Sequence, residues 1–142
     1  MIRKVLIAGL ATTMLVACSA DGRYADTSDG QVDEQGGVTL IAPKTLAERI
    51  ADGEAIQLID VRTPEEFAEG HIQGAINIPV DGFDPANLPD AGNASRILYC
   101  RSDRRSGVAA ERLAQSGQTA VHVEGGILAW QAEGLPVTAP ES

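Results

Sequence analysis

The residues best suited to chemistry lie in one short run that contains a single thiol, three arginines and two serine hydroxyls. The run reads Tyr99-Cys100-Arg101-Ser102-Asp103-Arg104-Arg105-Ser106. A loop that curls around a thiol can aim its backbone N–H groups inward, and a helix that follows adds the positive end of its dipole. Such surroundings favour the thiolate, the nucleophilic form of cysteine. We therefore predict that Cys100 is the nucleophile and that residues 101–106 bind an anionic substrate.

Less reactive interpretations also apply to this region. A single cysteine is often an inert core residue, but the arginines and the position between a strand and a helix favour a reactive Cys100. Asp60 ends a buried apolar run, where it can act as a catalytic acid or pair with an arginine, either Arg62 or Arg105. We favour the structural pair, because thiolate chemistry needs no proton shuttle of that kind. Asp60 and Arg62 are therefore predicted to lie near the site as structural residues.

Composition excludes several function classes. The chain has 142 residues, enough for one domain, and its formal charge of −9 makes nucleic acid a poor partner. His71 and His122 are single histidines without the spacing of metal ligands, and each is better explained by a structural hydrogen bond. Neither a metal nor a cofactor is expected.

Strand-like and helix-like patterns alternate through the part of the chain that must position Cys100. The expected strands are 38–41, 55–61, 75–78, 96–99 and 120–123. The expected helices are a segment around 46–50, then 64–70, 106–115 and 127–132, with a long loop at 79–95. Thr63 can cap the second helix and Glu66 sits where a capping box places its acid. This alternation predicts a parallel α/β layer structure, in which function gathers at the carboxyl ends of strands.

The N-terminus indicates export. Residues 1–17 join a basic start to a short apolar run, as in a secretory signal peptide, and the run is shorter than the roughly 20 residues that span a bilayer. Cys18 follows Leu15-Val16-Ala17 in a pattern that resembles a bacterial lipobox, so we expect lipid attachment at Cys18. The protein is then expected in the bacterial cell envelope, held to a membrane by the lipid anchor and facing the periplasm or the extracytoplasmic side. Ser19 slightly favours the outer membrane.

The rest of the chain divides into three parts. Residues 18–37 are polar and acidic, as in a flexible tether. Residues 38–137 form the expected domain, and residues 138–142 a C-terminal tail. Because the domain holds Cys100 without a second cysteine, it cannot form an internal disulfide, which favours group transfer over thiol–disulfide exchange.

Several motifs together resemble the single-domain form of the rhodanese family. They are Asp60-Val61-Arg62-Thr63-Pro64-Glu65-Glu66-Phe67, then Gly70-His71-Ile72-Gln73-Gly74-Ala75-Ile76-Asn77-Ile78-Pro79, the cysteine run, and Gly125-Gly126 with Trp130. The resemblance covers about Leu40 to Leu135. It implies a three-layer fold with a central five-stranded parallel sheet flanked by helices.

The same resemblance implies a sulfurtransferase. Cys100 would take a sulfane sulfur from thiosulfate or a related donor, hold it as a persulfide and pass it to cyanide or a thiol. The loop N–H groups and the Ser102 and Ser106 hydroxyls would stabilise the outer sulfur, and the three arginines would attract the anionic donor. The implied partners are small sulfur-containing anions and thiol acceptors, with a protein as a further candidate acceptor.

Two alternatives remain open. A persulfide carrier or redox-sensing module for a protein partner would form the same persulfide with little turnover of small donors. A phosphatase-like domain is disfavoured, because such loops have five residues between cysteine and arginine, whereas here Ser106 occupies that place and Arg105 comes one residue earlier.

Asp103 departs from the glycine that the family commonly has at this point of the loop. Aspartate tolerates left-handed backbone better than most residues, so the loop can still curl. Its carboxylate, however, opposes an anionic donor and a thiolate unless Arg104 or Arg101 pairs with it. Donor preference therefore depends on what Asp103 contacts.

Overall fold

A computed structural model describes residues 37–139 of the chain. Its strands are β1 (Val38–Ile41), β2 (Ile56–Asp60), β3 (Ile76–Asn77), β4 (Ser95–Tyr99) and β5 (Ala120–Val123). Its helices are α1 (Pro43–Ala51), α2 (Pro64–Glu69), α3 (Arg104–Gln115) and α4 (Gly126–Ala132). Strands and helices alternate as the hydrophobic pattern predicts.

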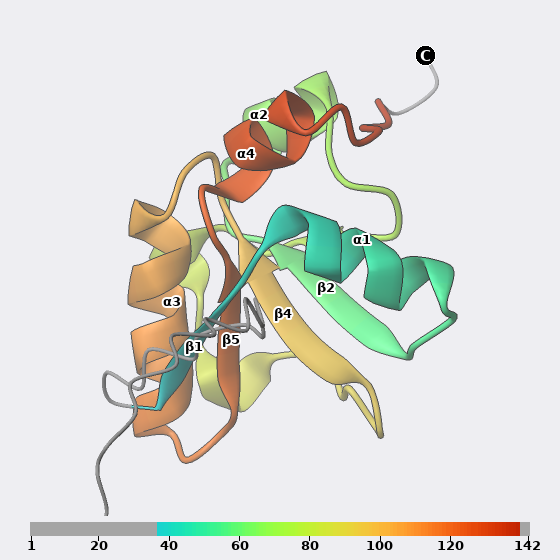
Figure 1. Cartoon of the computed structure of the whole chain (residues 1–142). Helices are drawn as coiled ribbons and strands as arrows, with labels where there is room; N and C mark the ends of the chain where they lie inside the picture. Colours follow the sequence, from blue (N-terminus) through green and yellow to red (C-terminus); the bar gives the residue numbers. More distant parts are fainter. Residues whose placement is uncertain (1–36, 140–142) are drawn as a thin grey trace, which may run out of the picture.

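The strands form one parallel sheet in the order β1-β5-β4-β2-β3. Strand β4 lies in the middle, between β5 and β2, and Cys100 follows directly after it. Helix α3 lies on one side of the sheet and α1 on the other, so the molecule has three layers (Figure 1). The predicted five-stranded parallel fold is confirmed.

Side-chain alternation along β4 sends Tyr99 and Cys100 to opposite faces of the sheet. Tyr99 packs in an apolar cluster with Leu46 of α1 and with residues of α4. Cys100 packs in the other cluster, with Leu113 of α3. The thiol therefore lies on the face that α3 covers, at the carboxyl end of a central strand.

Helix α2 begins as the sequence predicts. The Thr63 hydroxyl accepts from the Glu66 N–H at 3.3 Å, and the Glu66 carboxylate accepts from the Thr63 N–H at 3.1 Å, which completes the capping box. Pro64 occupies the first turn, where the missing N–H loses no hydrogen bond because the N–H groups of a first turn have no acceptor within the helix. This start follows directly on β2 and holds Glu66 close to the carboxyl edge of the sheet.

Several details of the elements differ from expectation. Helix α3 begins at Arg104 rather than at residue 106, because the Gly107 N–H already reaches the Asp103 carbonyl at 2.8 Å and closes the first turn. The loop at 79–95 contains two 3-10 turns. Thr138, the first residue after the expected domain, forms a short antiparallel bridge with His71 through two backbone hydrogen bonds of 2.8 Å.

The predicted signal peptide, Cys18 and the predicted tether up to residue 36 lie outside the described residues, so these predictions stay untested. Between residues 37 and 139 the structure contains no helix long and apolar enough to cross a membrane.

Candidate active site

The Cys100 side chain is buried just beneath the loop that follows β4. The residue is 1% exposed, and its Sγ donates to the Ser102 carbonyl oxygen at 3.0 Å. The Ser106 hydroxyl lies 3.4 Å from the same sulfur and donates to it. Of the two predicted serine donors, Ser106 thus reaches the thiol through its hydroxyl, whereas Ser102 presents its carbonyl.

The loop after Cys100 leaves a set of backbone donors without acceptors. Within residues 37–139, the N–H groups of residues 101–106 have no hydrogen-bond acceptor, and the Gly107 N–H is the first along the chain to find one. The last three of these N–H groups belong to the first turn of α3, where the helix dipole is positive. The loop at residues 101–106, predicted to bind an anion, therefore has the donors that an anion requires.

Helix α4 holds this loop in place. Its Ile127 N–H donates to the Cys100 carbonyl at 2.9 Å, and its Leu128 N–H donates to the Arg101 carbonyl at 3.1 Å. A Cβ on Gly126 would lie 2.4 Å from the Ser102 carbonyl oxygen and 2.5 Å from the Cys100 carbonyl oxygen. The backbone at Gly126 therefore touches the loop so closely that no side chain fits between them.

Asp103 pairs with the backbone rather than with an arginine. Its carboxylate accepts a hydrogen bond from the Gly125 N–H, just before α4. Among the described residues it forms no ion pair with Arg101 or Arg104. The carboxylate that replaces the family's glycine thus joins the loop to α4, and its charge is not neutralised by the neighbouring arginines.

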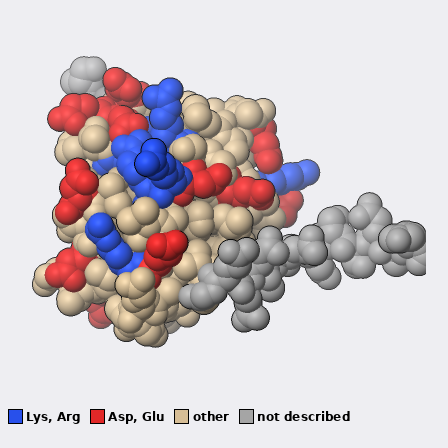
Figure 2. Space-filling view, turned by 90° about the vertical axis from the view of Figure 1, so that its left-hand side faces the viewer, with Lys and Arg blue, Asp and Glu red and all other residues tan. Residues whose placement is uncertain are grey.

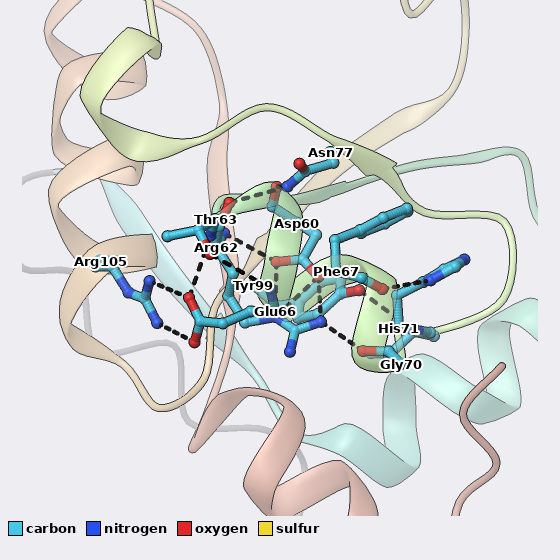
Figure 3. A network of polar contacts seen from close by, with 11 residues as sticks. Asp60, Arg62, Thr63, Glu66, Phe67, Gly70, His71, Asn77, Tyr99 and Arg105 are labelled. Atoms are coloured by element: carbon cyan, nitrogen blue, oxygen red, sulfur yellow. Dashed lines mark hydrogen bonds and ion pairs between the residues drawn. The ribbon is translucent and has the colours of Figure 1, made fainter. Parts of the chain in front are cut away.

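Of the two arginines that the sequence offers as partners for Asp60, Arg62 forms the buried pair. The carboxylate of Asp60, which is fully buried, accepts from Arg62 Nε at 2.9 Å and from Arg62 Nη2 at 2.6 Å (Figure 3). The same Arg62 Nη2 donates to the Gly70 carbonyl at 2.7 Å. Arg62 therefore connects the end of β2 to the end of α2.

Arg105 is paired with Glu66, a contact that sequence reasoning did not find because helix capping already explained Glu66. Its two Nη atoms donate to the two carboxylate oxygens at 2.6 and 2.8 Å (Figure 3). The hydrogen bond from Arg105 lowers the pKa of Glu66 to about 2. Because that pKa lies below the ordinary value of 4.5, the pair stabilises the fold fully above pH 4.5, and this contribution is lost as the pH falls toward 2.

The remaining two arginines of the loop, Arg101 and Arg104, are exposed. Basic side chains gather in the upper part of the face shown in Figure 2, the end of the molecule where α3 begins, and acidic side chains border them. With Arg105 held by Glu66, Arg101 and Arg104 supply the charge that can attract an anion to this end of the domain.

A cleft of about 260 Å³ opens beside the loop, between α2 and α4. Its charged lining comprises Arg62, Glu66, Glu69 and Arg101. Side chains of α4 and Val137 supply the apolar part. A small polar molecule can therefore reach the edge of the cysteine loop, residues 100–106, from this side.

Residues 42–133 match the family described as "Rhodanese-like domain". A protein named "Sulfurtransferase" from Allochromatium vinosum is 38% identical over 105 residues, which cover 73% of this chain and 98% of the relative. An uncharacterized protein from Synechocystis is 43% identical over 97 residues, 68% of this chain; the match spans only 54% of that relative. The thiosulfate sulfurtransferase PspE of Escherichia coli is 40% identical over 72 residues, 49% of this chain and 68% of PspE.

Solved structures have the same fold. A rhodanese-related protein from Thermoplasma volcanium is 36% identical and superimposes with a TM-score of 0.61 over 69% of this chain and 95% of that protein. A rhodanese-like domain protein from Staphylococcus aureus is 33% identical, with a TM-score of 0.56 over 70% of this chain and 98% of that one. The family match over residues 42–133 includes strands β2 to β5 and the loop after Cys100, whereas β1 lies just before it.

Proposed function

Because this chain belongs to the rhodanese-like domain family, we propose that it is a sulfurtransferase that carries sulfur as a persulfide on Cys100. The observation that carries the proposal is the buried Cys100 thiol, which is followed along the chain by six consecutive N–H groups, those of residues 101–106, that lack an acceptor among the described residues. These donors can stabilise the negative charge of a thiolate and of the outer sulfur of a persulfide. The sulfurtransferases among the similar proteins support the same chemistry.

The proposed donor is thiosulfate. The Cys100 thiolate attacks the outer sulfur of thiosulfate, a new S–S bond forms to Cys100, and the old S–S bond breaks as sulfite leaves with the electron pair. Cyanide or a thiolate then attacks the outer sulfur of the persulfide. The Cys100 thiolate leaves with the electron pair, and the product is thiocyanate or a new persulfide. Charge is conserved in both steps and no external oxidant is needed.

The loop residues have separate roles in this scheme. Arg101 and Arg104 are exposed and attract the dianionic donor, while Arg105 is held by Glu66 and keeps the first turn of α3 close to α2. The Ser106 hydroxyl donates to the sulfur of Cys100. The cleft beside Arg101 gives the thiol acceptor its approach.

The test is the mass of the protein after incubation with thiosulfate. We expect one added sulfur atom, which disappears when cyanide is added and does not form in Cys100→Ser. Cys18→Ser is the matched control, because it removes the other cysteine and should still gain the sulfur. A parent protein that gains no sulfur from thiosulfate, or a Cys100→Ser variant that does, contradicts the proposal.

We also propose that Cys18 carries a lipid that holds the domain to a membrane of the bacterial cell envelope, facing the periplasm or the extracytoplasmic side. The support is the sequence Leu15-Val16-Ala17-Cys18 after a basic and apolar leader. Cells grown with labelled palmitate should yield labelled protein, and Cys18→Ser should carry no label. Label retained in Cys18→Ser would contradict the anchor.

A further inference from the structure

A chain of polar contacts leads from Cys100 to a buried histidine of the neighbouring strand. The Ser106 hydroxyl, 3.4 Å from the sulfur, lies 3.2 Å from Nδ1 of His122. Ser106 is fully buried and His122 is 7% exposed. The three residues come from the end of β4, the first turn of α3 and the middle of β5, so the fold brings them together.

The Ser106 hydroxyl has one hydrogen and three neighbours that compete for it. These are the Cys100 sulfur, the Asp103 carbonyl oxygen at 3.2 Å and His122 Nδ1. A hydroxyl can give only one hydrogen but can accept at its lone pairs. If Nδ1 carries no proton, it draws the hydrogen away from the sulfur. If Nδ1 carries a proton, it donates to the Ser106 oxygen and leaves the hydrogen for the other two neighbours.

We propose that His122 is a positioning residue whose Nδ1–H donates to Ser106 and thereby directs the Ser106 hydrogen to the Cys100 sulfur. The contact strengthens as the sulfur becomes anionic, because hydrogen bonds to charged acceptors are stronger than those to neutral ones. The proposal rests on the proposed function, in which that sulfur is the nucleophile, and adds a residue outside the cysteine loop to its machinery.

The surroundings of His122 favour the neutral form of its ring. Burial lowers the pKa of His122, and the negative charge of Asp103 opposes that shift. Its strand neighbours are Leu98 of β4 and Leu40 of β1, both apolar. On the α3 side it meets Gly107, where a Cβ would stand 3.8 Å from Cε1. A neutral ring has a single N–H, so the position of that one hydrogen decides which way Ser106 donates.

The experiment measures how fast iodoacetamide alkylates Cys100 at different pH values, on the full chain, by the mass of the peptide that contains Cys100. In His122→Phe we expect the midpoint of the rate profile to move up by about one pH unit, because the charged sulfur loses roughly one hydrogen bond. His122→Asn should stay close to the parent, because its amide nitrogen can replace Nδ1 as the donor. Ser106→Ala should shift the midpoint as His122→Phe does.

The double variant Ser106→Ala with His122→Phe decides whether the histidine acts through the serine. We expect no shift beyond that of Ser106→Ala alone. An unmoved midpoint in His122→Phe, or a full further shift in the Ser106→Ala background, overturns the proposal. So does an imidazole ¹⁵N spectrum of the folded parent that places the proton on Nε2, a result that needs no variant. Alkylation requires no sulfur donor, so a chain that forms no persulfide refutes the proposed function and leaves this test valid.

Discussion

Replacing Gly126 by alanine is expected to lower the free energy of unfolding by about 3 kcal/mol and to abolish sulfur transfer. The new Cβ would stand 2.4 Å from the Ser102 carbonyl oxygen, 2.5 Å from the Cys100 carbonyl oxygen and 2.8 Å from the Arg101 carbonyl carbon. All three are backbone atoms, so the clash cannot be relieved by turning a side chain. The cysteine loop or the start of α4 must move, and a shift of the loop also moves its backbone N–H groups.

The matched control is Gly134→Ala, at the other end of α4. Both glycines have a positive φ, +56° for Gly126 and +72° for Gly134, but no atom lies within 4 Å of a Cβ built on Gly134. Gly134→Ala should therefore lower the free energy of unfolding by only about 1 kcal/mol, the strain of a side chain in left-handed backbone, and leave sulfur transfer intact. Urea unfolding and a thiosulfate assay measure both. Equal losses in the two variants would show that backbone conformation, rather than contact with the loop, makes Gly126 necessary.

Replacing Arg62 by methionine is expected to lower the free energy of unfolding by about 3 to 5 kcal/mol. The fully buried Asp60 would lose the guanidinium that donates to both of its oxygens, and a buried charge without its partner is costly. The change also removes the contact of 2.7 Å to the Gly70 carbonyl. Urea unfolding at neutral pH is the measurement.

The double variant Asp60→Asn with Arg62→Met tests this explanation. Asparagine has no charge, and its oxygen can still accept from the backbone N–H of residue 62, which lies 2.9 Å from the Asp60 carboxylate. We expect the double variant to be more stable than Arg62→Met by about 2 kcal/mol. A double variant no more stable than the single one would mean that Arg62 matters for its packing or its Gly70 contact, and that the unpaired carboxylate costs little.

Local patterns determined much of this protein before any contact between distant segments was known. The period of apolar residues predicted the alternation of strands and helices, and Thr63 with Glu66 predicted the start of α2. The single cysteine between a buried strand and a run of arginines predicted the nucleophile. The resemblance to the rhodanese family predicted the five-stranded sheet. The predictions of the sheet, of the alternating elements and of the start of α2 are confirmed, because propensity, capping and periodicity act over a few neighbouring residues. That Cys100 is the nucleophile stays a prediction.

Other parts of the site were decided by the tertiary structure alone. Arg105 meets Glu66 across 39 residues of sequence, and Ser106 meets His122 across 16. The Asp103 carboxylate meets the Gly125 N–H across 22 residues. These pairs depend on the strand order β1-β5-β4-β2-β3, which places β5 and β2 on either side of β4.

The cysteine loop shows which properties of the site follow from the sequence and which depend on the tertiary structure. The sequence alone identified the thiol and an arginine-rich turn after it. It could not show that Arg105 is occupied by Glu66, that Asp103 contacts backbone instead of arginine, or that Ser106 stands between Cys100 and His122. Residue type and spacing determine which groups are available for chemistry. Which of them remain free, and what each one faces, depends on the strands and helices that pack around the loop.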